Sequence, residues 1–190
     1  MKVIETHLKD AKIIETDVHG DHRGFFTESY NKERFNAFGI ENNFIQDNHS
    51  LSVEPGVLRG LHFQIPPKSQ TKLIRATTGV IYDVIVDLRK GSPTYKQWEG
   101  FILSEYNHRQ LLVPKGFAHG FVTLTPNCNV QYKVDAPYST EHDGGIIFDD
   151  PSLGIDWAID TDKAILSEKD KQHPTLDEWD NPFVWEGQSK

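Results

Sequence analysis

The chain has 190 residues, and its 20 lysines and arginines against 28 aspartates and glutamates give a formal net charge of −8 at pH 7. This length suits one domain, so we expect residues 1–190 to form a single domain with a C-terminal extension from about residue 175. The acidic balance excludes the basic surface that nucleic-acid binding needs, and no stretch reaches the roughly 18 apolar residues of a membrane span.

In chain order, the first predicted element is a short helix at residues 29–39, where Phe35 and Phe38 are three apart and Gly39 can end the helix. The elements that follow are strands, because short apolar or β-branched runs alternate with Gly, Pro and Asn. The clearest of these strands are expected at residues 80–88, 99–104, 109–114, 120–125 and 129–134. This pattern predicts an all-β sandwich or barrel.

Three further features belong to particular segments of the chain. The run at 80–88 is apolar at nearly every position, which indicates a strand with both faces covered. Ser167 to Asp170 reads as a capping box that opens a short helix. The acidic tail after Pro174 carries Trp179, Phe183 and Trp185, which we expect to dock on the body or on a partner chain.

The chain start and its cysteine content bear on the compartment. Residues 1–12 lack the apolar region of a secretory signal. Cys128 is the one cysteine in the sequence, so neither an intrachain disulfide nor a cysteine-based metal site can form. We expect a cytoplasmic protein, and Cys128 itself has no assigned role.

Two segments carry more chemistry than a core requires. Residues 56–64 (GVLRGLHFQ) hold Arg59 and His62, and residues 114–121 (PKGFAHGF) deliver His119 from a Pro/Gly turn. Taken singly, a histidine among apolar neighbours is more often a hydrogen-bonded core residue than a functional one. The two together favour a functional site.

The spacing of these segments resembles the paired motifs of the cupin β-barrels, which implies a cupin-like jelly roll. Two positions depart from the metal-binding cupin pattern: Gln64 replaces the second histidine of His-x-His, and Lys72 replaces a ligating glutamate. A protonated ammonium has no lone pair for a metal. We therefore expect no bound metal and no other cofactor, and a cationic cavity suited to an anionic or carbonyl-bearing small molecule.

Such a cavity suits proton abstraction beside a carbonyl. Histidine titrates in the range that a base needs at neutral pH, and Lys72 can stabilise an enolate oxygen. Inversion of a carbon also needs an acid on the opposite face, for which Tyr132 is a candidate. The strand by itself favours an ordinary tyrosine with its hydroxyl at the rim.

The chain is similar to the dTDP-4-dehydrorhamnose 3,5-epimerase family over about residues 1–175, and the remaining tail is not covered. The segments that carry the resemblance are GDHRGFFTESYN (20–31), FIQDNHS (44–50), VLRGLHFQ (57–64), residues 72–98, PKGFAHGF (114–121), VQYKVDAPYS (130–139), and DPSLGIDW with LSEKD within 150–170. The resemblance implies an epimerase that inverts C3 and C5 of dTDP-4-dehydro-6-deoxy-D-glucose to give dTDP-4-dehydro-L-rhamnose. Both carbons flank the C4 ketone, so one base and one acid can serve both inversions.

The resemblance also implies the role of each site residue. His62 matches the catalytic base, Asp170 the carboxylate paired with it, Tyr132 the acid, and Lys72 the stabiliser of the enolate. From sequence alone, Asp170 would be only a capping residue. The substrate-binding group implied by the resemblance comprises Arg23, Arg59 and Lys169 near the diphosphate, Tyr138 stacked on thymine, His119 at sugar or phosphate, and Glu28, Gln46, Asp47, Asn48 and Asp143, the last standing where the family usually has Glu.

Strict strand alternation would put Arg59 and His62 on opposite faces. Both can line one pocket only if the strand bulges or twists near Gly60, so we predict an irregularity there.

Two other functions stay open from the sequence. One is an epimerase that inverts only C3 or only C5 of a related nucleotide-linked keto sugar, and the other is a non-catalytic sugar-nucleotide-binding barrel. A pure binder needs no acid opposite a base, which favours catalysis. The resemblance further implies a homodimer.

Overall fold

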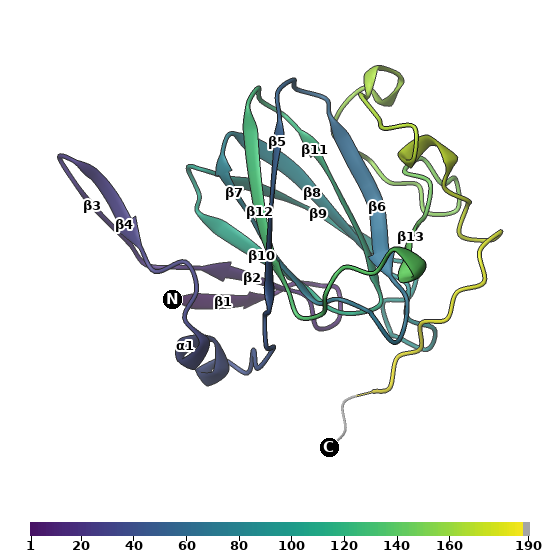
Figure 1. Cartoon of the computed structure of the whole chain (residues 1–190), viewed down its shortest axis with the longest axis horizontal. Coiled ribbons are helices and arrows are strands. Elements are labelled where there is room, and N and C mark those ends of the chain that lie inside the picture. The colour runs from purple at the N-terminus through teal and green to yellow at the C-terminus, as the bar shows by residue number, and fades with distance from the viewer. Residues whose placement is uncertain (188–190) are drawn as a thin grey trace.

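The computed structural model describes residues 1–187 and consists mainly of antiparallel strands in two facing sheets (Figure 1). The first sheet has six strands in the order β1-β2-β10-β7-β12-β5. Their bounds are β1 Lys2–Glu5, β2 Lys12–Glu15, β10 Arg109–Val113, β7 Lys72–Thr78, β12 Cys128–Val134 and β5 Gln46–Ser52. The second sheet has five strands, in the order β13-β6-β11-β8-β9. Their bounds are β13 Asp143–Gly145, β6 Leu58–Gln64, β11 Phe117–Thr123, β8 Val80–Asp87 and β9 Trp98–Ser104.

Successive strands alternate between the sheets from β5 to β8 and again from β9 to β13, which is jelly-roll connectivity. The predicted all-β jelly roll is confirmed, as are the five strands expected between residues 80 and 134. A separate hairpin, β3 (Val18–Asp21) with β4 (Gly24–Thr27), projects away from the two sheets (Figure 1). No helix in the described part of the chain has the length and apolar character to cross a membrane.

Helical structure is confined to short pieces. The helix expected at 29–39 is α1 (Lys32–Ala37), which begins later because the Asn31 side chain accepts a hydrogen bond from the backbone N–H of Arg34. Gly39, with φ of 75°, follows its end as expected. The remaining pieces are 3₁₀ turns, η1 (Thr140–His142), η2 (Thr161–Lys163) and η3 (Asp170–Gln172), and η3 is the short helix expected after Ser167.

The apolar core has two main layers, one on each face of the five-stranded sheet. Ile81 and Ile85 of β8 face the space between the sheets, while Val84 and Val86 face the opposite side. Both faces of β8 are therefore covered, as its apolar run predicts. A third, smaller cluster lies around Phe35 of α1, on the outer face of the six-stranded sheet.

The C-terminal segment covers the outer face of the five-stranded sheet. Trp157 is fully buried there and donates a hydrogen bond from Nε1 to the carbonyl oxygen of Phe148 at 2.8 Å. Phe183 is buried, Trp179 packs against Phe63 with ring centroids 4.5 Å apart, and Trp185 is half-buried. The tail thus docks on the body of its own chain, and the packing brings residues 167–173 beside β6.

The predicted irregularity near Gly60 is confirmed. His62 pairs with His119 and Arg59 with Phe121, so two residues of β6 oppose Gly120 alone on β11. This is a β-bulge. Gly60 has a φ of 135°, and an added Cβ would lie 2.5 Å from the Cα of Gly120. Only glycine suits both the dihedral angle and the close approach of the two backbones.

We predict that Gly60→Ala lowers the free energy of unfolding and distorts the bulge that turns Arg59 and His62 to the same side of β6. Gly24→Ala is the matched control, because Gly24 has a similar φ of 128° but no atom within 4 Å of the added Cβ. The strained dihedral costs each variant about 1–3 kcal/mol, and overpacking adds about 1–3 kcal/mol for Gly60→Ala alone. Urea unfolding at fixed protein concentration measures both. Equal loss in the two variants would contradict the role given to backbone crowding at Gly60.

Candidate active site

A cavity of about 300 Å³ lies at one end of the space between the two sheets. It is lined by strands from both sheets and by the C-terminal segment. The residues that line it are Asn48, His49, Ser50, Arg59, His62, Lys72, His119, Phe121, Tyr132, Ser167, Lys169 and Asp170. The bulge at Gly60 is what allows Arg59 and His62 to face this same cavity.

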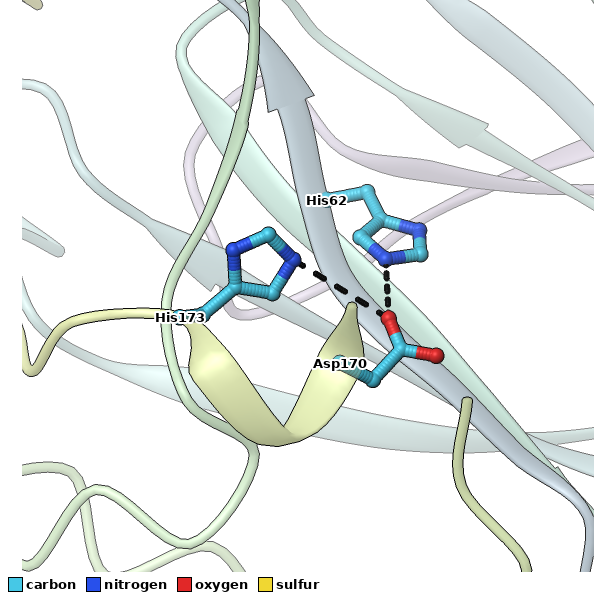
Figure 2. Close-up of side chains that lie close together, drawn as sticks. All are labelled: His62, Asp170 and His173. Carbon is cyan, nitrogen blue, oxygen red and sulfur yellow. Dashed lines mark hydrogen bonds and ion pairs between the residues drawn. The ribbon is translucent and has the colours of Figure 1, made fainter. Parts of the chain in front are cut away.

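The histidine of β6 is paired with a carboxylate 108 residues away (Figure 2). His62 Nε2 and Asp170 Oδ1 are 2.5 Å apart, and the Asp170 side chain is only 5% exposed. Ser167 Oγ donates to the other carboxylate oxygen at 2.7 Å and accepts from the Asp170 backbone N–H at 3.1 Å. Ser167 therefore caps the turn, and the Asp170 carboxylate is held by Ser167 and holds His62.

The charge state of Asp170 follows from these contacts. Burial opposes its ionisation, but the hydrogen bonds from His62 and Ser167 outweigh burial and hold the pKa of Asp170 below its usual value. A carboxylate only accepts hydrogen bonds, so Nε2 of His62 carries the proton. Nδ1 is then the nitrogen with a free lone pair.

A second carboxylate lies deeper, beneath the cavity floor. His119 Nε2 and Asp83 Oδ2 are 3.0 Å apart, and Asp83 is fully buried. Burial lowers the pKa of His119 despite the facing carboxylate, so the ring is neutral at pH 7 and donates from Nε2 to Asp83. Burial also lowers the pKa of Lys72 to about 8, and the charges of Asp83 and Asp143 counteract this shift. Lys72 is thus a buried ammonium that loses its proton in mildly alkaline solution.

Tyr132 enters the cavity from the six-stranded sheet, whereas His62 enters from the five-stranded sheet. Burial raises the pKa of Tyr132 above the usual value of a phenol. The hydroxyl is therefore protonated at neutral pH and available as a donor. A base and an acid carried by facing sheets can act on the two sides of one small molecule.

The rim of the cavity holds a cluster of polar residues. Lys169 Nζ is paired with Asp143 Oδ2, to which the Tyr138 hydroxyl also donates at 3.2 Å. Gln46 donates to Asn48 at 2.9 Å and lies against the backbone of Tyr138. Tyr138 itself is 57% exposed, so its ring is free to stack on a ligand.

Six predicted substrate-binding residues do not line this cavity: Gln46, Tyr138 and Asp143 belong to the rim cluster just described, and Arg23, Glu28 and Asp47 lie elsewhere. Arg23 lies at the tip of the projecting hairpin, where Asp21 pairs with it. Glu28 pairs with Arg34 at 3.2 Å, and Asp47 pairs with Lys133 at 2.8 Å and faces a separate cavity. Within one protomer, the structure does not bring Arg23 and Glu28 to the other site residues.

Sequence reasoning missed Asp83 and His173. Asp83 interrupts the apolar run of β8, and a charged residue in a strand buried on both faces is a signal that could have identified it. His173 follows η3, and its Nε2 lies 3.9 Å from Asp170 Oδ1. No sequence pattern marks His173, because its position depends on how the C-terminal segment packs.

Comparison with known proteins gives one family for nearly the whole chain. The family model described as dTDP-4-dehydrorhamnose 3,5-epimerase matches residues 5–178. An enzyme of that name from Methanothermobacter thermautotrophicus is 49% identical over 178 residues, which cover 93% of this chain and 95% of the relative.

Comparison with solved structures gives the same family. A crystal structure of dTDP-4-dehydrorhamnose 3,5-epimerase from Bacillus anthracis, with TDP and PPi bound, is 59% identical, has a TM-score of 0.89, and covers 92% of this chain and 99% of its own. A dTDP-6-deoxy-D-glucose-3,5-epimerase from Legionella pneumophila, in complex with dTDP-4-keto-L-rhamnose, is 44% identical with a TM-score of 0.90. It covers 94% of each chain.

Proposed function

The chain belongs to the dTDP-4-dehydrorhamnose 3,5-epimerase family, and we propose that it inverts C3 and C5 of dTDP-4-dehydro-6-deoxy-D-glucose by proton transfer within the cavity between its sheets. It is an isomerase of nucleotide-linked keto sugars. The observation that carries the mechanism is the presence of His62 and Tyr132 on facing sheets of one cavity, which the buried Lys72 of β7, the neighbour of β12, also lines.

His62 is the proposed base. Its Nδ1 removes the proton from a carbon beside the C4 ketone, and the electrons of the broken C–H bond form an enolate with its charge on the C4 oxygen. Asp170 stabilises the imidazolium that results and holds the ring in the tautomer that leaves Nδ1 free. Burial of Asp170 and the hydrogen bond that it accepts from Ser167 hold the carboxylate in the orientation that contacts His62.

Lys72 is the proposed stabiliser of the enolate oxygen. An ammonium in a desolvated cavity interacts with a developing negative charge far more strongly than it would in water. The pKa of about 8 leaves Lys72 protonated at neutral pH. The carbonyl oxygen of His62, 3.4 Å from Nζ, helps to direct the ammonium.

Tyr132 is the proposed acid. Its hydroxyl delivers a proton to the opposite face of the same carbon, which inverts the centre and leaves a phenolate that regains its proton from solvent. The imidazolium of His62 loses its proton before the second cycle. C3 and C5 flank one ketone, so the same three residues serve both inversions.

The nucleotide is proposed to extend from the cavity over its rim. Arg59 and Lys169 line the cavity and suit the diphosphate oxygens, and His119, whose Nε2 donates to Asp83, offers Nδ1 as an acceptor to a sugar hydroxyl. The exposed ring of Tyr138 suits thymine. The remaining polar contacts are assigned to Gln46, Asp47, Asn48 and Asp143, of which Asp47 turns its side chain away and would act through its backbone.

A homodimer would explain the position of Arg23 and Glu28. The hairpin β3–β4 extends into solvent with Phe25 61% and Phe26 70% exposed, which is unfavourable for a free monomer. We propose that the hairpin of each protomer covers the site of the other and brings Arg23 to the diphosphate and Glu28 to the nucleotide. Each site would then need both chains.

Two further proposals concern the domain and its compartment. Residues 1–190 form one domain, a proposal supported by the burial of Leu176 and Phe183 from the C-terminal extension against the five-stranded sheet. The cytoplasm is the proposed compartment, supported by Cys128, which is a buried free thiol.

Deuterium exchange tests the proposed base and acid. In deuterated water the wild-type protein is expected to place deuterium at both C3 and C5, whereas His62→Ala abolishes exchange at both. Tyr132→Phe retains the base, so exchange continues with retention of configuration while epimerisation falls about 10²–10⁴-fold. NMR of the sugar measures exchange and configuration together. Exchange by His62→Ala at the wild-type rate would remove His62 from the role, and exchange at one carbon alone in the wild type would indicate a single epimerisation.

The pH dependence tests Lys72. The pKa of about 8 means that the required ammonium is present below this pH and lost above it, so kcat/KM is expected to fall as pH rises through about 8. Lys72→Met should lose roughly 10²–10³-fold in rate and lack this alkaline limb. Asp83→Asn should move the limb to lower pH, because Asp83 favours the charged lysine. If kcat/KM of Lys72→Met still fell as pH rises through about 8, the fall would belong to a group other than Lys72.

Subunit complementation tests the shared site. Arg23→Ala and His62→Ala homodimers should each be strongly impaired, since each lacks a required group in both sites. After mixing and subunit exchange, half of the dimers are hybrids with one intact site, so about one quarter of wild-type activity should return. No recovery despite hybrid formation, shown by native mass spectrometry, would place Arg23 outside the partner's site.

A further inference from the structure

His173 carries a buried nitrogen to which the proposed mechanism gives no task. Among the described residues, its Nε2 is buried and has no hydrogen-bond partner, and its side chain is only 9% exposed. Gly145 leaves room at this nitrogen, because a Cβ there would lie 2.5 Å from Nε2. Leaving a buried polar atom unpaired costs about 1–3 kcal/mol, so such an atom calls for a ligand or another explanation.

The unpaired nitrogen points toward the catalytic pair. Figure 2 shows the two imidazole rings side by side, with the contacts from His62 and His173 meeting at one carboxylate oxygen of Asp170. Asp170 Oδ1 is 2.5 Å from His62 Nε2 and 3.9 Å from His173 Nε2, and all three atoms lie within 4.8 Å of one another. The ring centroids of the two histidines are 5.5 Å apart and the rings are steeply inclined at 71°.

We propose that His62, Asp170 and His173 form a binding site for a divalent transition-metal ion, with Zn²⁺ as the best match, and that metal binding inhibits the epimerase. Two imidazoles and one carboxylate are ligands that Zn²⁺ favours. Bonds of about 2.0–2.2 Å place two ligand atoms on tetrahedral zinc roughly 3.3 Å apart. The three atoms reach that spacing through side-chain shifts of about 1 Å or less, with Ser167 still holding the other oxygen of Asp170.

This site differs from the metal position of the cupin motif. Gln64 and Lys72 replace two of the expected ligands there and take no part in the proposed cluster, so the two sites share His62 alone. The cluster instead joins β6 to the C-terminal segment beyond the sheet. Two nearby ammonium groups oppose a cation, but Lys169 is paired with Asp143, and Lys72 is offset by Asp83.

Inhibition follows from the chemistry of imidazole. A metal on Nε2 of His62 displaces the proton shared with Asp170, and the neutral ring then carries its proton on Nδ1. That nitrogen is the proposed base, so the ring can no longer accept a proton from the sugar. Inhibition therefore rests on the function proposed for His62, whereas metal binding itself does not.

The experiment uses the full-length chain freed of metal with a chelator. Calorimetric titration with ZnCl₂ is expected to give one bound ion per protomer, and CoCl₂ should give the intense visible absorption of a four-coordinate site that Zn²⁺ then removes. Epimerisation should fall with the same Zn²⁺ dependence and recover with EDTA. His173→Gln keeps the His62–Asp170 pair and should weaken both Zn²⁺ binding and inhibition by roughly tenfold or more.

His7→Gln is the matched control, because His7 also pairs with a carboxylate, Glu99, at 2.8 Å, but at the surface. It should bind Zn²⁺ and be inhibited like the wild type. Zinc that fails to bind the wild type, or binds His173→Gln equally tightly, overturns the site. Binding without inhibition supports the site and removes the base role from His62. X-ray absorption of zinc-bound wild type should show two imidazole ligands, and one or none overturns the site without reference to any variant.

Discussion

The contact between His62 and Asp170 is the interaction on which the rest of the site depends. It joins β6 of the five-stranded sheet to a turn 108 residues later in the chain. A short contact between residues so distant in sequence needs rigid support on both sides. The sheet supplies it for His62, and the C-terminal segment supplies it for Asp170 because Trp157, Leu176 and Phe183 bury that segment against the outer face of the same sheet. Core packing therefore sets the geometry of the proposed proton transfer.

The second constraint is that charged groups buried away from water need a compensating charge or must become neutral. Lys72, His119 and Asp83 are all buried near one another, and the carboxylate compensates the ammonium while burial keeps the imidazole neutral. The result is a cavity whose buried ammonium can face an enolate oxygen, while His119 stays neutral. The same burial keeps Tyr132 protonated. One pocket thus holds the proposed base, the proposed acid and the buried ammonium.

The sequence by itself determined the fold class and most members of the site. Alternating apolar runs separated by Gly, Pro and Asn are a local property, so the strands from residue 80 to 134 were predictable with their approximate bounds. The conflict between strand alternation and a shared pocket for Arg59 and His62 was also local, and it predicted the bulge at Gly60. The paired motifs around His62 and His119, together with the family resemblance, supplied the remaining residues and the reaction.

Tertiary structure alone decided which of those residues meet. From the sequence, Asp170 is only a capping residue. The packing of the C-terminal segment brings its carboxylate into contact with His62. His173 entered the site in the same way, through packing that no local pattern encodes, whereas the charge of Asp83 within the apolar run of β8 is a local signal. Arg23 and Glu28 show the converse, since the resemblance places both in the site, while the hairpin that carries Arg23 projects away from the two sheets and Glu28 pairs with Arg34. Contacts between distant segments depend on how whole surfaces pack, and spacing along the chain carries no information about that packing.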